Sequence, residues 1–406
     1  MKNQTGRIDL KSFLPAIPGV VVCAIFARLL LTLLPSYEID MRGYQAWSAY
    51  MAEYGFSRVY DTFHIVYAPA YMYLLWFTGK IAKIFSLGYG THVFLIKFWS
   101  VASDIIGGLL IFLIGKKYGK ERLGLVLGIL YSLNPAVFFN SSIWGQFDSI
   151  PATMLLGVIY CFNTKRSITA AILFGAAVLT KPQSAVLAPI VLILYFRKVS
   201  ARKIILTILG GLSAYIFITL PFAANRPILW IIDLYLKSGG DYPYATANGF
   251  NFWTLAKGQI VPDNQPFLGW TYAAWSLIIL TLVVIVSFIA ILRNIKSAYA
   301  IYYTGYFICF AVFMFGTRMH ERYLFPALIF LAVCILWNPR LWYSFVVLSL
   351  CHLANQWYIY YLSFRKVYWV SANDPIAYAI AVVTMLAMLY AVYEMVLIIK
   401  KKTCLS

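Results

Sequence analysis

The chain has 406 residues, of which 62% are hydrophobic and only 12% are charged. A soluble domain has roughly 45–50% apolar and about 25% charged residues. Since the apolar residues extend along almost the whole length, no single buried core can contain them. The composition therefore excludes a water-soluble enzyme and a disordered chain. It predicts an all-α polytopic membrane protein whose residues 1–406 form one transmembrane domain, with no separate soluble domain.

The formal net charge of +19 is located mainly in short connections between apolar segments. This placement is typical of cytoplasmic loops and argues against nucleic-acid binding. The six cysteines show no CxxC spacing and five lie in apolar segments, so we expect them to pack between helices. Residues 13–34 are expected to span the membrane rather than to form a cleavable signal peptide, because no small-residue cleavage site follows them.

Long apolar runs predict about 11–13 transmembrane helices. They lie near residues 13–35, 91–115, 121–139, 150–163, 167–180, 183–197, 203–222, 270–292, 297–315, 322–337, 341–362 and 375–399. One further segment, 67–86, is ambiguous. If it does not fully cross, the connections on the same side of the membrane as the N-terminus hold 19 of the 33 basic residues, counting Lys2, Arg7 and Lys11. The positive-inside rule therefore predicts an in-plane or re-entrant element at 67–86 and cytoplasmic N- and C-termini.

This topology leaves two long connections outside, residues 36–90 and 223–269. Nine of the 14 acidic residues also lie outside, which suggests chemistry on that face. In the first connection, large apolar side chains recur at three- and four-residue spacing: Met41, Tyr44, Trp47, Tyr50, Met51 and Tyr54. The spacing predicts an amphipathic helix that lies flat on the membrane, with packing against other protein as the alternative.

Three groups of polar residues on the outer side are candidates for a site. Asp40 stands at the start of the amphipathic helix, where its carboxylate can accept a proton from a hydroxyl; N-capping is the alternative. A polar hairpin includes Trp144, Gln146 and Asp148, of which the last two can bind sugar hydroxyls. The third group is Lys181 with Gln183, for which a snorkelling lysine is the alternative.

A fourth group, Arg318, His320, Glu321 and Arg322, lies at the outer end of a predicted span. Such charges are costly at membrane level unless they face a polar cavity or a ligand, and arginine binds lipid phosphate well. Anchoring of the helix end is the alternative. The histidines do not pair at ligand spacing, so no metal site is expected. DxD, Walker A and GxGxxG sequences are absent, which leaves nucleotide cofactors unsupported.

Two acids lie within or beside predicted spans. Asp104 is in the second span and Asp374 is at the edge of the last one. Polar groups at membrane depth usually pair with one another, so we expect structural roles for both.

Several short motifs together resemble a known family. The first set is Asp40, Trp47, Tyr54-Gly55, Tyr60, Tyr67-Ala68-Pro69-Ala70-Tyr71 and Leu75-Trp76. The later sets are Trp144-Gly145-Gln146-Phe147-Asp148, Lys181-Pro182-Gln183, Tyr244–Trp253 (YATANGFNFW) and the run from His320 to Pro326 (HERYLFP). In this order they resemble GT-C glycosyltransferases, and more closely bacterial mannosyltransferase-like proteins related to the GPI-anchor second mannosyltransferase.

The resemblance implies a GT-C-like fold and an inverting glycosyltransferase. It would move a hexose, with mannose favoured, from a polyprenyl-phosphate donor to a glycan, lipid or protein hydroxyl, without a cofactor. The implied base is Asp40 and the supporting acid is Asp148. The implied phosphate-binding residues are Arg318, His320, Arg322 and Lys181. The implied substrate-binding residues are Glu321, Gln146, Trp144, Gln183, Tyr244, Asn251 and Trp253.

The implied location is a bacterial cell membrane with the site on the extracytoplasmic face and membrane lipids around it. A transporter or flippase of lipid-linked sugars is one alternative, which predicts inverted repeats and charges near mid-membrane. A non-catalytic glycan-binding membrane protein with the same fold is another. Relatives have Asp-Tyr-Pro-Pro where this chain has Val66-Tyr67-Ala68-Pro69, a departure in the first outer connection.

Overall fold

The computed structural model describes residues 17–401. Almost all regular structure in this range is helical, and the strands found there are the two-residue β1 (Pro266–Phe267) and β2 (Trp270–Thr271), which pair antiparallel. The prediction of an all-α polytopic membrane protein is confirmed. The N-terminal Lys2, Arg7 and Lys11 and the C-terminal tail with Cys404 lie outside the described residues, so their cytoplasmic placement stays a prediction.

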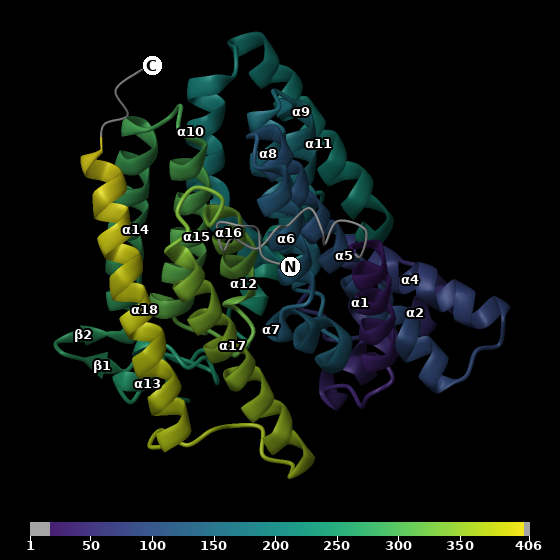
Figure 1. Ribbon diagram of the computed structural model, residues 1–406. Coiled ribbons are helices and arrows are strands. Elements are labelled where there is room, and N and C mark those ends of the chain that lie inside the picture. The colour runs from purple at the N-terminus through teal and green to yellow at the C-terminus, as the bar shows by residue number, and fades with distance from the viewer. Residues whose placement is uncertain (1–16, 402–406) are drawn as a thin grey trace.

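Each predicted apolar run within the described range forms helix. These helices are α1 (Ile17–Leu31), α5 (Tyr89–Lys117), α6 (Glu121–Ser132), α8 (Ser149–Asn163), α9 (Ser167–Val178), the 3-10 segment η3 (Pro182–Leu187) with α10 (Ala188–Lys198), α11 (Ala201–Ala223), α14 (Tyr272–Arg293), α15 (Ala298–Phe315), α16 (Phe325–Cys334), α17 (Leu341–Phe364) and α18 (Pro375–Lys400). Figure 1 shows them gathered into one bundle, in which α14 and α18 lie side by side.

Five of the described helices, α5, α11, α14, α15 and α18, are long and apolar enough to cross a membrane. The number is six if α6 and the helical segment after it form one bent span. The sequence predicts about 11–13 spans because it counts shorter apolar runs as well. A helix such as α9, with 12 residues, is only about 18 Å long, whereas the hydrocarbon core is about 30 Å thick.

The bend after α6 places the predicted polar hairpin inside the bundle. α6 is followed by α7 (Pro135–Phe138) and the π-helical segment η2 (Phe139–Trp144), at an angle of 44°. Pro135 cannot donate a backbone hydrogen bond, and the Asn134 side chain instead accepts from the amide of Ala136 at 2.9 Å. Gly145 then reverses the chain with φ of +89°, a conformation that favours glycine.

Glycines allow α5 and α6 to touch along their backbones. A Cβ atom on Gly128 would lie 2.3 Å from the carbonyl oxygen of Gly108, and one on Gly115 would lie 2.6 Å from the Cα of Gly124. Such close contact between apolar helices is gained only with small residues at the interface. The pair forms a rigid wall of the bundle.

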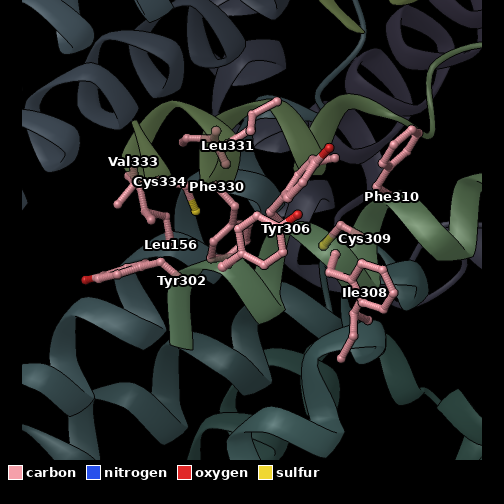
Figure 2. Packing of buried hydrophobic residues seen from close by; sticks show 14 of the residues in the cluster. Leu156, Tyr302, Tyr306, Ile308, Cys309, Phe310, Phe330, Leu331, Val333 and Cys334 are labelled. Atoms are coloured by element: carbon pink, nitrogen blue, oxygen red, sulfur yellow. The ribbon is translucent and has the colours of Figure 1, made fainter. Parts of the chain in front are cut away.

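The centre of the bundle is the contact between α15 and α16. Figure 2 shows the rings of Tyr302, Tyr306 and Phe330 packed together with the thiols of Cys309 and Cys334. Four cysteines with described side chains, Cys161, Cys309, Cys334 and Cys351, are free and buried, so their predicted packing role is confirmed. The side chain of Cys23 and all of Cys404 lie outside what the structure describes.

Both membrane-level acids have structural partners. Asp104 on α5 forms a buried ion pair with Arg28 on α1 and accepts a hydrogen bond from Ser141 at 2.5 Å. Asp374 caps α18 by accepting from the amides of Ile376 and Ala377. The structural roles predicted for the two acids are therefore confirmed.

The first long connection contains α2 (Glu38–Tyr54), α3 (Val59–Thr62) and α4 (Pro69–Ile84). Figure 1 shows α2 and α4 side by side, projecting sideways from the bundle. α4 is not among the helices long and apolar enough to cross, as expected for 67–86. The amphipathic helix forms where predicted, but Met41, Tyr44 and Met51 are buried in a protein cluster with α4, so the flat-on-membrane interpretation is wrong for this face.

The second long connection contains α12 (Trp230–Ser238) and α13 (Phe252–Leu255), followed by the two strands. The predicted cytoplasmic connections meet at the opposite end of the bundle, the upper end in Figure 1. There Tyr118 packs on Trp337 at 5.1 Å, Lys120 donates to the carbonyl of Leu336, and Asn294 donates to the carbonyl of Ile398. The bundle thus has one basic end and one end with the long connections.

Candidate functional site

A cavity of about 640 Å³ lies at the end with the long connections. Its walls come from the start of α2, the segment before α4, η3, the end of α12, the connection before α16 and the connection between α17 and α18. The predicted site residues that line it are Asp40, Gln183, His320, Glu321 and Arg322. Residues far apart in the sequence are therefore brought into one polar cavity.

The Asp40 carboxylate is held by two uncharged donors. Its Oδ2 accepts from Trp144 Nε1 at 2.9 Å and from Gln146 Nε2 at 2.6 Å. The N-cap of α2 is Tyr37, so Asp40 lies in the first turn and does not cap the helix. A carboxylate there is favoured by the helix dipole. Asp40 therefore presents a fixed acceptor to the cavity without a directly paired Lys or Arg among the described residues.

Gln146 is itself fixed from the other side. Its Oε1 accepts a hydrogen bond from the Tyr44 hydroxyl at 3.1 Å, and that hydroxyl lies 3.5 Å from the hydroxyl of Tyr67. Burial raises the pKa of both Tyr44 and Tyr67, so both phenols stay neutral. The chain of hydrogen bonds fixes the orientation of the amide that holds Asp40.

Glu321 and Arg322, in the connection before α16, form a buried pair at the cavity wall. Arg322 Nη1 donates to Glu321 Oε1 at 2.6 Å, while Arg322 Nε is buried and has no partner among the described residues. Burial raises the pKa of Glu321, and the neighbouring Arg322 opposes this rise. The side chain of Arg322 also lines the cavity, where a guanidinium is suited to bind a phosphate oxygen.

His320 is buried beside this pair. Its ring packs edge-on against Tyr242 at 4.9 Å and Tyr323 at 5.2 Å. Burial, with a contribution from Arg322, lowers the pKa of His320 well below its ordinary value. The ring is therefore neutral at pH 7 and adds no positive charge to the site.

Asp148 and Lys181 form a second buried pair behind the cavity. Asp148 also accepts a hydrogen bond from Asn140 Nδ2 at 3.2 Å, and the Lys181 ammonium lies 4.9 Å from the ring centre of Tyr323. Burial lowers the pKa of Lys181, while Asp148 opposes that effect. The pair lines a separate small cavity together with Gln183, whose amide donates to the Tyr323 hydroxyl.

Four predicted site residues stand elsewhere. Arg318 pairs with Asp263 at 2.7 Å and contacts the carbonyl of Gly239. The backbone carbonyl of Tyr244 accepts from the amide of Arg318. Asn251 caps α13, and Trp253 Nε1 donates to the carbonyl of Phe315. None of the four lines the cavity; they join the second long connection to the bundle.

Aromatic residues that the sequence analysis does not assign to the site complete the walls. They are Tyr37, Tyr44, Trp47, Tyr67, Tyr235, Tyr242, Tyr323, Tyr368 and Trp369. Tyr368 and Trp369 lie between α17 and α18, in a part of the chain without a transferable motif. Two adjacent large aromatic residues in the connection between two predicted spans are the signal that indicates them. Aromatic faces beside carboxylates and an arginine suit a ligand with sugar rings and phosphate.

Comparison with known families decides how this cavity is interpreted. The family model of the GPI transamidase subunit PIG-U matches residues 42–312, about two thirds of the chain. The chain belongs to the PIG-U family. A search of curated proteins gives no match.

Membership of the PIG-U family contradicts the family predicted from the short motifs. The matched family is that of a transamidase subunit, so the GT-C assignment, the mannosyltransferase resemblance and the predicted hexosyltransferase activity are wrong. The bacterial location came from the same resemblance and loses its support; the multi-pass membrane character remains. The match begins after Asp40 and ends before Arg318, so the charged residues on two walls of the cavity lie outside it.

Proposed function

We propose that this chain is a membrane subunit of a GPI transamidase assembly that binds the headgroup of the anchor lipid. Membership of the PIG-U family supports the assembly, and the cavity supports the ligand. The proposed lipid partner is an anchor lipid, whose headgroup contains sugars and phosphate, in place of a polyprenyl-phosphate sugar. The other subunits and the surrounding membrane lipids are the further proposed partners.

The observation that carries this proposal is the presence of Asp40 and Arg322 in the lining of one cavity. Asp40 offers an oriented carboxylate for sugar hydroxyls, and Arg322 offers a guanidinium at the cavity wall for a phosphate. The aromatic side chains that line the same cavity can cover sugar faces. A polar cavity with both kinds of group and an apolar surround is suited to holding a lipid headgroup at the membrane surface.

Bond formation is assigned to another subunit. Acyl transfer to an amine proceeds through an activated nucleophile such as a cysteine thiolate. The free cysteines with described side chains are all buried in the apolar bundle, and buried structural cysteines are inert. The proposed role of this chain is therefore to hold and orient the lipid.

The proposed orientation follows from the two ends of the bundle. The end with the basic connections faces the cytoplasm under the positive-inside rule, and the cavity opens on the opposite face. The proposal also includes more membrane spans than the five to six long helices. Shorter helices such as α8 and α16 would cross where the bilayer is locally thinner.

The test is equilibrium binding of an anchor lipid to the full chain in lipid nanodiscs. Asp40→Asn keeps the size of the side chain and removes its charge, so binding is expected to weaken roughly tenfold, as for the loss of one charge-assisted hydrogen bond. Glu38→Gln is the matched control, because Glu38 is exposed on the same helix and pairs only with Arg42. Equal affinity in the Asp40→Asn variant and the wild type would contradict the proposal.

A further inference from the structure

Another pocket, of about 470 Å³, lies at the basic end of the bundle, away from the cavity of Asp40. Four lysines line it: Lys117, Lys165, Lys203 and Lys296. The remaining wall is made of Tyr118, Phe162, Asn163, Ser167 and Val199. Neither the family match nor the proposed headgroup site assigns a role to this pocket.

The four lysines come from four separate connections. Lys117 ends α5, Lys165 lies between α8 and α9, Lys203 is in the first turn of α11, and Lys296 follows α14. No Asp or Glu is among the residues that line the pocket. Glu121, the acid that follows Lys117 in the sequence, lies 3.8 Å from Lys116 instead. Like charges gathered around one pocket repel each other, and an anion between them removes that repulsion.

The start of α9 adds a second, independent feature. The helix begins at Ser167, which lines the pocket, and the N-cap residue Arg166 provides no side-chain cap. The first amides of a helix have no carbonyl within the helix to donate to, and the helix dipole favours an anion there. Lysines and free amides together are the groups that bind phosphate oxygens.

The surroundings of the pocket fit a lipid. Tyr118, Phe162 and Val199 form an apolar part of its wall. α11, which begins beside it, is long and apolar enough to span and exposes a row of aliphatic side chains: Ile205, Leu206, Ile208, Leu209 and Leu212. We propose that this pocket binds the phosphate headgroup of an anionic membrane lipid whose acyl chains lie along α11. Basic pockets between membrane helices bind such headgroups by this chemistry.

The experiment titrates phosphatidylglycerol into the full chain in a nonionic detergent and counts bound lipid by native mass spectrometry. The double variant Lys165→Gln/Lys203→Gln is expected to weaken binding roughly tenfold or more, because each cation near a phosphate contributes on the order of fivefold. The control Arg340→Gln/Lys400→Gln removes the same charge at the same end, outside the pocket, and is expected to change binding less than twofold.

Two further arms separate the alternatives. Lys165→Arg/Lys203→Arg keeps both charges and is expected to retain the lipid, which excludes misfolding as the cause of a loss. Inorganic phosphate at the same concentration is expected to leave bound phosphatidylglycerol in place. The proposal is overturned if the two double Gln variants lose lipid equally, since the lysines then act only through the net charge. It is also overturned if inorganic phosphate displaces the lipid.

Discussion

Asp40 differs from the other outer carboxylates in its partners. Glu53 pairs with Lys83, Asp61 with Arg226 and Asp263 with Arg318, whereas Asp40 accepts from the neutral Trp144 and Gln146. A carboxylate fixed by neutral donors keeps its negative charge available to a ligand. Because of this contrast we place the site around Asp40, and we assign structural roles to Glu53, Asp61 and Asp263.

His320 gives a prediction of pH dependence at the residue scale. Burial lowers its pKa below the ordinary value of 6.5, so the unfolded chain binds a proton that the folded chain does not. Stability is therefore lost as the pH falls below about 6.5, by up to about 1.4 kcal/mol per pH unit for this one group. The His320→Gln variant is expected to lose less stability than the wild type between pH 6.5 and pH 5.

Thermal unfolding in one detergent at several pH values measures this difference. Glu321, whose pKa is raised by burial, has the opposite effect, since its protonated form is favoured in the folded chain as the pH falls. It is present in both proteins, so the difference between their slopes reports on His320. His64→Gln serves as the control, because that side chain is 80% exposed. Identical slopes for wild type and His320→Gln would refute the neutral, buried histidine.

The sequence identifies candidate charged residues, but it does not tell which of them line the cavity and which stabilise the fold. Asp40, Glu321 and Arg322 stand out because charges are rare in this chain and costly near lipid. Arg318 has the same appearance in the sequence, and only the fold brings Asp263 to it. Trp369 lacks any charge or motif, and its place in the cavity depends on how α17 and α18 are joined. Neutral aromatic wall residues are therefore harder to assign to the site from the sequence than charged ones.

At the scale of elements, α2 depends on close contact with α4. A Cβ atom on Gly79 would lie 2.2 Å from the carbonyl oxygen of Ser48 on α2, so Gly79→Ala forces the two helices apart. The expected loss of stability is about 1–3 kcal/mol, as for other overpacked contacts. Since α2 positions Asp40, headgroup binding is expected to weaken in parallel.

Gly175→Ala is the matched control for this contact. Gly175 is inside α9, and an added Cβ meets no atom within 4 Å, so the expected effect is neutral to stabilising by at most about 1 kcal/mol. Thermal unfolding of both variants in the same detergent measures the difference. If Gly79→Ala is as stable as Gly175→Ala, the α2–α4 contact is not as close as described.

Apolar spacing predicts where α2 forms, but it does not tell which surface its face meets. Aromatic and aliphatic side chains suit a membrane interface and a protein interface equally. The face that includes Tyr44 and Met51 packs against α4, and Phe147 stacks on Tyr71 in the same cluster. The break at Pro135 is also only partly predictable from the sequence. The proline indicates that the helix is interrupted, whereas the 44° angle of the bend depends on the surrounding packing.

The whole molecule has a basic end and an end with a polar cavity. Composition alone predicts its membrane class, and charge counting predicts which connections gather at the basic end. The short motifs, in contrast, predict the wrong family, because they also serve packing: Asn251 and Trp253 in the YATANGFNFW run hold α13 and α15 together. Such residues report on the fold and not on the reaction, which explains the wrong transferase prediction.

We propose that the chain binds the headgroup of an anchor lipid and leaves the covalent structure of that lipid unchanged. The most direct measurement is mass spectrometry of an anchor lipid recovered after incubation with the purified full chain in nanodiscs. We expect lipid bound to the wild type, less bound to Asp40→Asn, and an intact lipid mass in both. A recovered lipid that has gained or lost a hexose, or no specific binding of the lipid, would contradict the proposed binding role.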